Sequence, residues 1–181
     1  MELPQGHNPF TKISSEEIYR RPYVRFMKDK IRINGLEKDY SYADIANGIG
    51  IVAINDRNEV ALVGQWRYPI NRYDWEIPAG MREDNEDSLL GAQRELKEEV
   101  GVTAKKWTKL GEFFMECSST TKKAIAFLAQ DLKLGDQSLD DDEKIEVLWI
   151  PFQEAIGLID SGEIRDGFTV LALLRAKEKI Q

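Results

Sequence analysis

The sequence contains very little cysteine and histidine. Cys117 and His7 are the single residues of their types among 181. One cysteine excludes a disulfide within the chain and a cysteine-rich zinc site, and it fits a reducing compartment. His7 lies near the start of the chain, where few contacts hold a side chain, so we expect no catalytic triad, Cys-His pair or His-ligated metal site.

Long apolar segments are also missing. No run approaches the roughly 18 consecutive apolar residues of a transmembrane helix. The first residues do not combine a basic start with an apolar run, so no signal peptide is expected. With 42% apolar and 31% charged residues, the composition fits one globular domain with a core, located in the cytoplasm.

Positive charge is in deficit, because the net charge is −7. This balance argues against a general binder of nucleic acid or of anionic membranes. The deficit is local: residues 80–102 carry −4 and residues 136–146 carry −5, so the rest of the chain is slightly positive. An acidic run is usually a solvated face, and the spacing within each run must decide its meaning.

Residues 1–46 are expected to form an N-terminal strand extension. Short strands are predicted at 25–28 and 31–33, on either side of a turn at Lys28 to Lys30. Asn34-Gly35 marks a second turn, followed by a strand at 40–45. These strands are too polar to bury a core alone, so they should pack on the main domain or on a second subunit.

Residues 47–181 are expected to form the main domain. Its order is mostly strands, with one central helix and one or two terminal helices, which predicts a mixed sheet between helices, of the α/β class. The strands are predicted at 49–54 and 59–64, which read as a hairpin, and at 73–77, 107–115, 124–130 and 145–150; the helices are predicted at 86–100, 152–159 and 168–179.

The helix at 86–100 carries three glutamates on one face. At about 100° per residue, Glu95, Glu98 and Glu99 fall within ~100° of one another, apart from an apolar stripe that includes Leu96. Like charges at these spacings destabilise a helix by roughly 0.2–0.5 kcal/mol per pair. A hard divalent cation such as Mg²⁺ makes the cluster favourable. The alternative is a solvated helix face.

The same segment resembles the complete box of the Nudix hydrolases. Gly80, Glu86 and the run from Arg94 to Val102, with Gly101 inside it, fill each specified position at the family's spacing. Residues 48–160 fit the family's arrangement, and the N-terminal strands resemble those of the ADP-ribose and nucleoside-diphosphate-sugar pyrophosphatases. The resemblance implies a Nudix-type α/β/α sandwich with an N-terminal antiparallel strand extension.

The resemblance also implies a metal site. Glu95 and Glu99 match the principal ligands of Mg²⁺, for which Mn²⁺ is a possible substitute. Glu98 matches a nearby ligand, and the backbone carbonyl of Ala79 matches a further one. Four other positions match the structural part of the motif: Gly80, Glu86, Arg94 and Gly101.

Other residues are implied to act on the substrate. Arg67 matches an arginine that meets phosphates, and Glu76 matches an acidic residue beside the metals. Independently of the resemblance, a nucleobase could stack on Tyr42 or on one of three other tyrosines, Tyr19, Tyr23 and Tyr40. A surface arginine, a strand-end glutamate and a packing tyrosine are the alternatives. Glu143 is the expected general base, with Asp141 in reserve; a solvated acidic loop is the alternative.

The expected activity is Mg²⁺-dependent hydrolysis of the diphosphate linkage of nucleoside diphosphate sugars such as ADP-ribose or GDP-mannose. Ser118 stands where ADP-ribose hydrolases commonly have proline, so GDP-mannose stays open. The alternatives are hydrolysis of nucleoside triphosphates or dinucleoside polyphosphates, and nucleotide binding without hydrolysis. The resemblance implies a homodimer, a state in which this branch commonly exchanges N-terminal strands between its two subunits.

Overall fold

A computed structural model describes residues 1, 3–83, 85–139 and 144–180 of the chain. The chain divides into two compact units, and each is described by itself. The first unit comprises Met1–Ala46 and Phe114–Lys122; the second comprises Asn47–Phe113 and Lys123–Gln181. In the part of the chain that is described, no helix combines the length and the apolar character that crossing a membrane requires.

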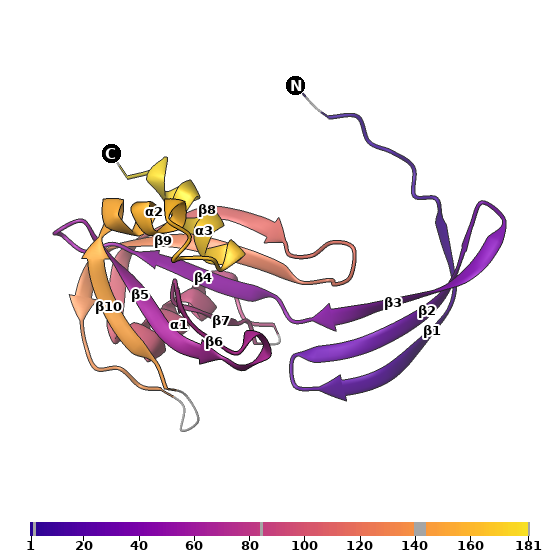
Figure 1. Ribbon diagram of the computed structural model, residues 1–181, viewed down its shortest axis with the longest axis horizontal. Coiled ribbons are helices and arrows are strands. Elements are labelled where there is room, and N and C mark those ends of the chain that lie inside the picture. Colours follow the sequence, from indigo (N-terminus) through magenta and orange to yellow (C-terminus); the bar gives the residue numbers. More distant parts are fainter. Residues whose placement is uncertain (2, 84, 140–143, 181) are drawn as a thin grey trace. The chain divides into compact units, whose positions relative to one another are not determined.

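The first unit contains a three-stranded antiparallel sheet in the order β1-β2-β3 (Figure 1). Its strands are β1 (Phe10–Arg21), β2 (Val24–Ile33) and β3 (Leu36–Ile45). Asn34 and Gly35 form the predicted second turn, with φ of 49° and 79°. The turn predicted at Lys28 to Lys30 is wrong, because β2 runs straight through it and pairs with β1 on one side and β3 on the other.

This sheet buries few of its side chains. Every residue of β1 is exposed, and in β2 and β3 the buried residues are Val24, Asp29 and Ile31. The segment 114–122 lies along β3, where Ala43 donates its N–H to the carbonyl of Ser119 at 2.9 Å. Within the described residues, the first unit therefore has no extended apolar core.

The second unit contains two sheets, in the orders β7-β4-β9-β8 and β10-β5-β6. Most neighbouring strands pair antiparallel, whereas β4 pairs parallel with β9, so the sheet is mixed as expected. The strands are β4 (Gly48–Ala53), β5 (Glu59–Arg67), β6 (Arg72–Glu76), β7 (Ala79–Met81), β8 (Val102–Phe114), β9 (Lys123–Leu134) and β10 (Glu146–Pro151), with a short 3-10 helix at Tyr68–Ile70.

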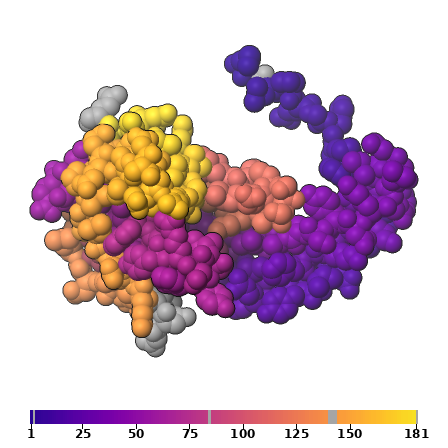
Figure 2. Space-filling model, in the orientation of Figure 1, coloured from indigo at the N-terminus to yellow at the C-terminus, as the bar shows by residue number. Residues whose placement is uncertain are grey.

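Helices cover these sheets on both sides. The helices are α1 (Ser88–Val100), α2 (Phe152–Asp160) and α3 (Gly167–Lys177). In β4, Ile49 and Ile51 pack in the cluster that contains α1, whereas Val52 packs in the cluster that contains α2 and α3. Side chains alternate across a strand, so both faces of β4 are buried. The result is an α/β/α sandwich, with α2 and α3 side by side at the surface (Figure 2).

The predicted hairpin of 49–54 and 59–64 is wrong. β4 and β5 belong to different sheets, and an isolated bridge between Ile54 and Val60 is the pairing recorded between their ends. Distant strands supply the partners instead, because β4 pairs with β9 and β7 while β5 pairs with β10 and β6. A short loop between two apolar runs predicts adjacent pairing, but it cannot reveal which strands return later in the chain.

Candidate active site

Helix α1 has a defined start and end. Asp87 is its N-cap, and its carboxylate accepts from the N–H groups of Leu89 at 2.9 Å and Leu90 at 3.3 Å. At the other end, Gly101 has a φ of 72° and donates its N–H to the carbonyl of Lys97 at 3.0 Å. The helix predicted at 86–100 is thus present, beginning at Ser88.

Two of the three glutamates predicted on one face of α1 are buried. Glu95 is 8% exposed and Glu99 is 4% exposed, whereas Glu98 is partly exposed. Glu95 lies directly against Gly80 in β7, where a Cβ would come 2.0 Å from the glutamate carboxylate. The expectation that the acidic edge of the helix is separate from its buried edge is therefore wrong, because β7 packs over the acidic side.

Arg94 lies at the centre of a group of carboxylates. Its Nε donates to Glu86 at 3.0 Å, and its Nη1 donates to Glu95 at 2.8 Å and to Glu98 at 3.0 Å. Its Nη2 donates to the carbonyl of Met81 at 3.2 Å. Hydrogen bonding to Glu86 is the largest cause that raises the pKa of Arg94, and the same bond lowers the pKa of Glu86. Arg94 therefore joins the loop before α1 to the helix.

The carboxylate of Glu99 is held from the other side. The N–H of Ala79 donates to its Oε2 at 2.8 Å. The backbone at Ala79 thus binds the glutamate through its N–H, while the role implied for its carbonyl as a metal ligand stays a prediction. Because the bond joins β7 to the last turn of α1, it sets where this buried carboxylate lies.

Arg67 and Glu76 form an ion pair at neighbouring strands β5 and β6. The Nε of Arg67 donates to Oε1 of Glu76 at 2.8 Å, and its Nη2 binds Oε2 of the same carboxylate. Hydrogen bonding to Glu76 raises the pKa of Arg67, and the charges of Glu99 and Asp166 raise it further. Arg67 is therefore within electrostatic range of one α1 carboxylate, that of Glu99.

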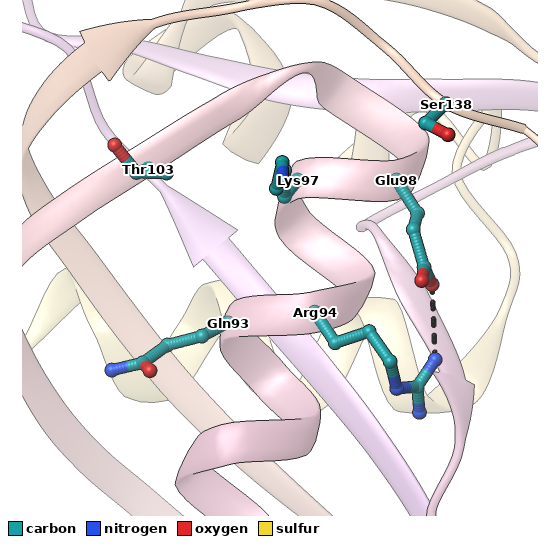
Figure 3. Close-up of a pocket in the computed structure, with 6 residues that line it drawn as sticks. All are labelled: Gln93, Arg94, Lys97, Glu98, Thr103 and Ser138. Atoms are coloured by element: carbon teal, nitrogen blue, oxygen red, sulfur yellow. Dashed lines mark hydrogen bonds and ion pairs between the residues drawn. The ribbon is translucent and has the colours of Figure 1, made fainter.

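An open pocket of about 420 Å³ borders this cluster. Arg94 and Glu98 line it and point toward one another, whereas Gln93 extends away from them (Figure 3). The remaining lining residues are Lys97, Thr103 and Ser138. The pocket therefore gives solvent access to the exposed end of the carboxylate cluster.

Tyr42, Glu143 and Asp141 are the other predicted site residues. Tyr42 lies half-buried in β3 of the first unit. Glu143 and Asp141, the expected base and its reserve, lie outside the described residues. Their roles stay predictions.

Sequence reasoning missed Gln137. Its side-chain amide donates to the backbone carbonyl of Glu99 at 2.6 Å. A glutamine in a polar loop carries no signal of its own, because the same residue type is usually a solvated surface side chain. Only the folded chain shows that it binds the end of α1.

The donor atoms around α1 fit a hard divalent cation. Carboxylate oxygens are the ligands that such ions prefer, and the glycine at position 80 leaves room for the buried carboxylate of Glu95. In residues 1, 3–83, 85–139 and 144–180, however, no three acidic, histidine or cysteine side chains are gathered around one ion position. Arg94 binds Glu95 and Glu98, so a cation would compete with its guanidinium for these oxygens.

Comparisons with known proteins identify the family of this chain. Residues 45–170 match the family model described as NUDIX domain. The chain is 31% identical to ADP-ribose pyrophosphatase of Bacillus subtilis (strain 168), over 93% of this chain and 94% of that protein. It is 32% identical to GDP-mannose pyrophosphatase of Yersinia pestis (strain Pestoides F), over 74% and 72% of the two chains.

A solved structure gives independent support for the fold. The crystal structure of an ADP compounds hydrolase superposes with a TM-score of 0.85 at 23% identity, covering 97% of this chain and 96% of the other. At this identity the likeness concerns the fold, and it confirms the expected sandwich class.

Proposed function

The chain belongs to the Nudix family, and we propose that it hydrolyses the diphosphate linkage of nucleoside diphosphate sugars. In this reaction the oxygen of water forms a bond to one phosphorus, and the bond from that phosphorus to the bridging oxygen breaks. The products are a nucleoside monophosphate and a sugar phosphate, and the water protons pass to the base and to solvent.

The buried position of Glu95 and Glu99 against β7 carries this proposal. A buried carboxylate is costly unless it is paired or binds a metal, and Arg94 and the Ala79 N–H supply part of this pairing. Both glutamates are less than a tenth exposed, and they lie in the part of the chain that matches the family model. A solvated helix face would leave these side chains in water.

We assign Glu95, Glu99 and Glu98 as the residues that hold Mg²⁺, with the Ala79 carbonyl as a further ligand and Mn²⁺ as a substitute. When bound, a divalent ion lowers the pKa of water and neutralises charge on phosphate oxygens. Two contacts within the chain would set the position of the ion. The Ala79 N–H orients Glu99, and Arg94 orients Glu98.

Arg67 supplies positive charge for the phosphates of the substrate. Its guanidinium is held by Glu76, which is 7% exposed, so less side-chain freedom is lost when an anion binds. The same pairing means that Glu76 sets the direction of the arginine. Glu143 is assigned as the general base, with Asp141 in reserve, and the resemblance of the sequence supports this assignment. Tyr42 is one candidate for contact with the nucleobase, because an aromatic side chain can stack on a base.

A panel of substrates tests the reaction. The full chain with Mg²⁺ is incubated with ADP-ribose, GDP-mannose, UDP-glucose, a dinucleoside polyphosphate and nucleoside triphosphates, and monophosphate and phosphate release are measured. We expect hydrolysis of ADP-ribose or GDP-mannose, in line with the names of the two relatives. Preference for triphosphates would overturn the sugar assignment, and release from none of the compounds would favour a binding protein.

The chain is proposed to form a homodimer through its first unit, in an arrangement that allows the two subunits to exchange strands. Its sheet exposes apolar side chains that include Ile18, Tyr19 and Phe26, and exposed apolar surface of this kind marks an interaction site. Light scattering should give twice the chain mass of 20.8 kDa. A monomeric mass would contradict the proposal.

A cytoplasmic location is proposed on the cysteine content. Cys117 is exposed and is the single cysteine of the sequence, which suits a reducing compartment. Fractionation of the cells that produce the protein tests this location. Recovery in a membrane or secreted fraction would contradict it.

A further inference from the structure

The end of helix α1 is capped by a segment from elsewhere in the chain. The last carbonyl groups of a helix have no partner inside it. Here Ser138 donates its N–H to the carbonyl of Glu98 at 3.1 Å, and the side-chain amide of Gln137 donates to the carbonyl of Glu99 at 2.6 Å. Residues 135–138, which we term the clasp, thus satisfy two carbonyls of the last turn.

Close packing of two glycines brings the clasp to the helix. Gly135 donates its N–H to the carbonyl of Gly101 at 2.7 Å. A Cβ at Gly101 would lie 2.8 Å from the backbone nitrogen of Gln137, and one at Gly135 would lie 3.2 Å from the Gly101 carbonyl oxygen. Gly101 is therefore needed for close approach as well as for its positive φ.

The two glutamates of the last turn are held at both ends. For Glu99, Gln137 binds the backbone carbonyl and Ala79 binds the carboxylate. For Glu98, Ser138 binds the backbone carbonyl and Arg94 binds the carboxylate. Removing the clasp would leave the carboxylate contacts in place but would free the backbone from which both side chains extend.

We propose that Gln137 is a positioning residue that fixes the last turn of α1 and, through it, the carboxylates of Glu98 and Glu99. Metal ligands depend on outer partners for their orientation. The inference rests on the proposed function, in which these carboxylates hold a divalent ion. Gln137 is distinguished within the clasp because it acts through a side chain, which substitution can remove.

The experiment measures Mn²⁺ binding by electron paramagnetic resonance on the full chain, together with kcat and KM for ADP-ribose. Gln137→Glu keeps the size of the side chain but replaces the donor with a carboxylate, at the negative end of the helix dipole. We expect the Kd for Mn²⁺ to rise about tenfold, and kcat at saturating metal to fall about tenfold with KM unchanged.

Further variants separate positioning from folding. Gln137→Lys restores a donor and should bring the Kd within about twofold of the wild type, because a charge-assisted bond from the ammonium group then replaces the neutral amide bond. Gln153→Glu makes the same charge change at an exposed position of α2 and should leave both readouts unchanged. Gln137→Ala replaces Gln137→Glu as the test if the latter does not fold.

The outcomes distinguish this inference from the proposed function. Unchanged Mn²⁺ affinity and kcat in Gln137→Glu or Gln137→Ala would overturn the inference, even if the melting temperature falls. Absence of Mn²⁺ binding by the wild type would overturn it as well. A wild type that binds Mn²⁺ but hydrolyses no member of the panel would overturn the proposed function, while weaker Mn²⁺ binding by Gln137→Glu would still support the positioning role.

Discussion

The two units differ in how their strands are covered. In the first unit, each of the 12 residues of β1 is exposed, whereas in the second unit each of the 6 residues of β4 is buried. A sheet without a packed face is only marginally stable in water. The difference indicates that the second unit supplies its own core, while the first depends on contacts beyond its own sheet.

The charged residues of the two units differ in the same way. In the first unit, Arg32 and Glu37 form a pair in which both side chains are about half exposed, at 50% and 48%. In the second, the pair of Arg94 and Glu86 leaves 29% and 14% of the side chains exposed. Exposed pairs contribute little to stability because water screens them. The charged pair of the first unit therefore lies in solvent, whereas the charged pair of the second unit holds the candidate site together.

The largest effect should follow from a glutamate of the second unit. Glu99→Gln removes a proposed metal ligand, so kcat should fall by at least about a hundredfold, since even outer partners of a metal ligand cost 10- to 100-fold. Circular dichroism should remain that of the wild type. Glu37→Gln makes the same change in the first unit and should retain full kcat. Full activity of Glu99→Gln would refute the ligand assignment.

The next effect concerns the cores. Leu96 is completely buried in the α1 cluster, so Leu96→Ala should lower the free energy of unfolding by about 2–5 kcal/mol. Leu36 lies at the β2–β3 turn and is 72% exposed, so Leu36→Ala should change it by less than about 0.5 kcal/mol. Urea unfolding measures both variants. Equal losses would show that Leu36 is covered in solution and would break the comparison.

A smaller effect is expected at the start of α1. Asp87→Ala removes the acceptor for two N–H groups, which should lower the free energy of unfolding by about 1 kcal/mol. Asp39→Ala, at an exposed position of β3, should leave the unfolding midpoint unchanged. The measurement is again urea unfolding. A loss at Asp39 that matches the loss at Asp87 would argue against capping as the cause.

The smallest effect should appear in the pH dependence of stability. Arg94 lowers the pKa of Glu86, so this contact stabilises the folded chain above the ordinary glutamate pKa of about 4.3. The contribution is lost as the pH falls through the lowered pKa. Glu86→Gln should therefore flatten the decline in stability on the acid side.

The first unit provides the matched control for this pH dependence. Arg32 lowers the pKa of Glu37 in the same direction, but the carboxylate of Glu37 is far more exposed than that of Glu86. Glu37→Gln should flatten the acid limb less than Glu86→Gln when urea midpoints are compared between pH 7 and pH 3. A larger effect at Glu37 would contradict the comparison.

Local patterns in the sequence predicted the local structures well. The helix at 86–100 follows from a 3.6-residue periodicity and from the glycine at 101 that ends it, both of which act within a few residues, whereas its N-cap, Asp87, was found in the structure. The Asn34-Gly35 turn follows in the same way, since these residue types accept positive φ. The family resemblance likewise rests on residues spaced closely around one helix, and the family model confirms it.

Predictions that required distant partners were less successful. The charged residues Lys28 to Lys30 stand between two predicted strands and predict a turn, but pairing with strands on both sides keeps β2 extended. The predicted hairpin failed because β9, far along the chain, pairs with β4. Such pairing depends on which strands meet in three dimensions.

The amino-acid sequence was sufficient to predict the helix, the three glutamates and the family to which the chain belongs, because these depend on spacing along one element. The folded chain was needed to show that β7 buries Glu95 and Glu99, that Arg94 joins Glu95 and Glu98 to Glu86, and that Gln137 binds the end of α1. Spacing along a helix sets which side chains share a face, whereas burial and hydrogen bonding depend on what other segments bring to that face.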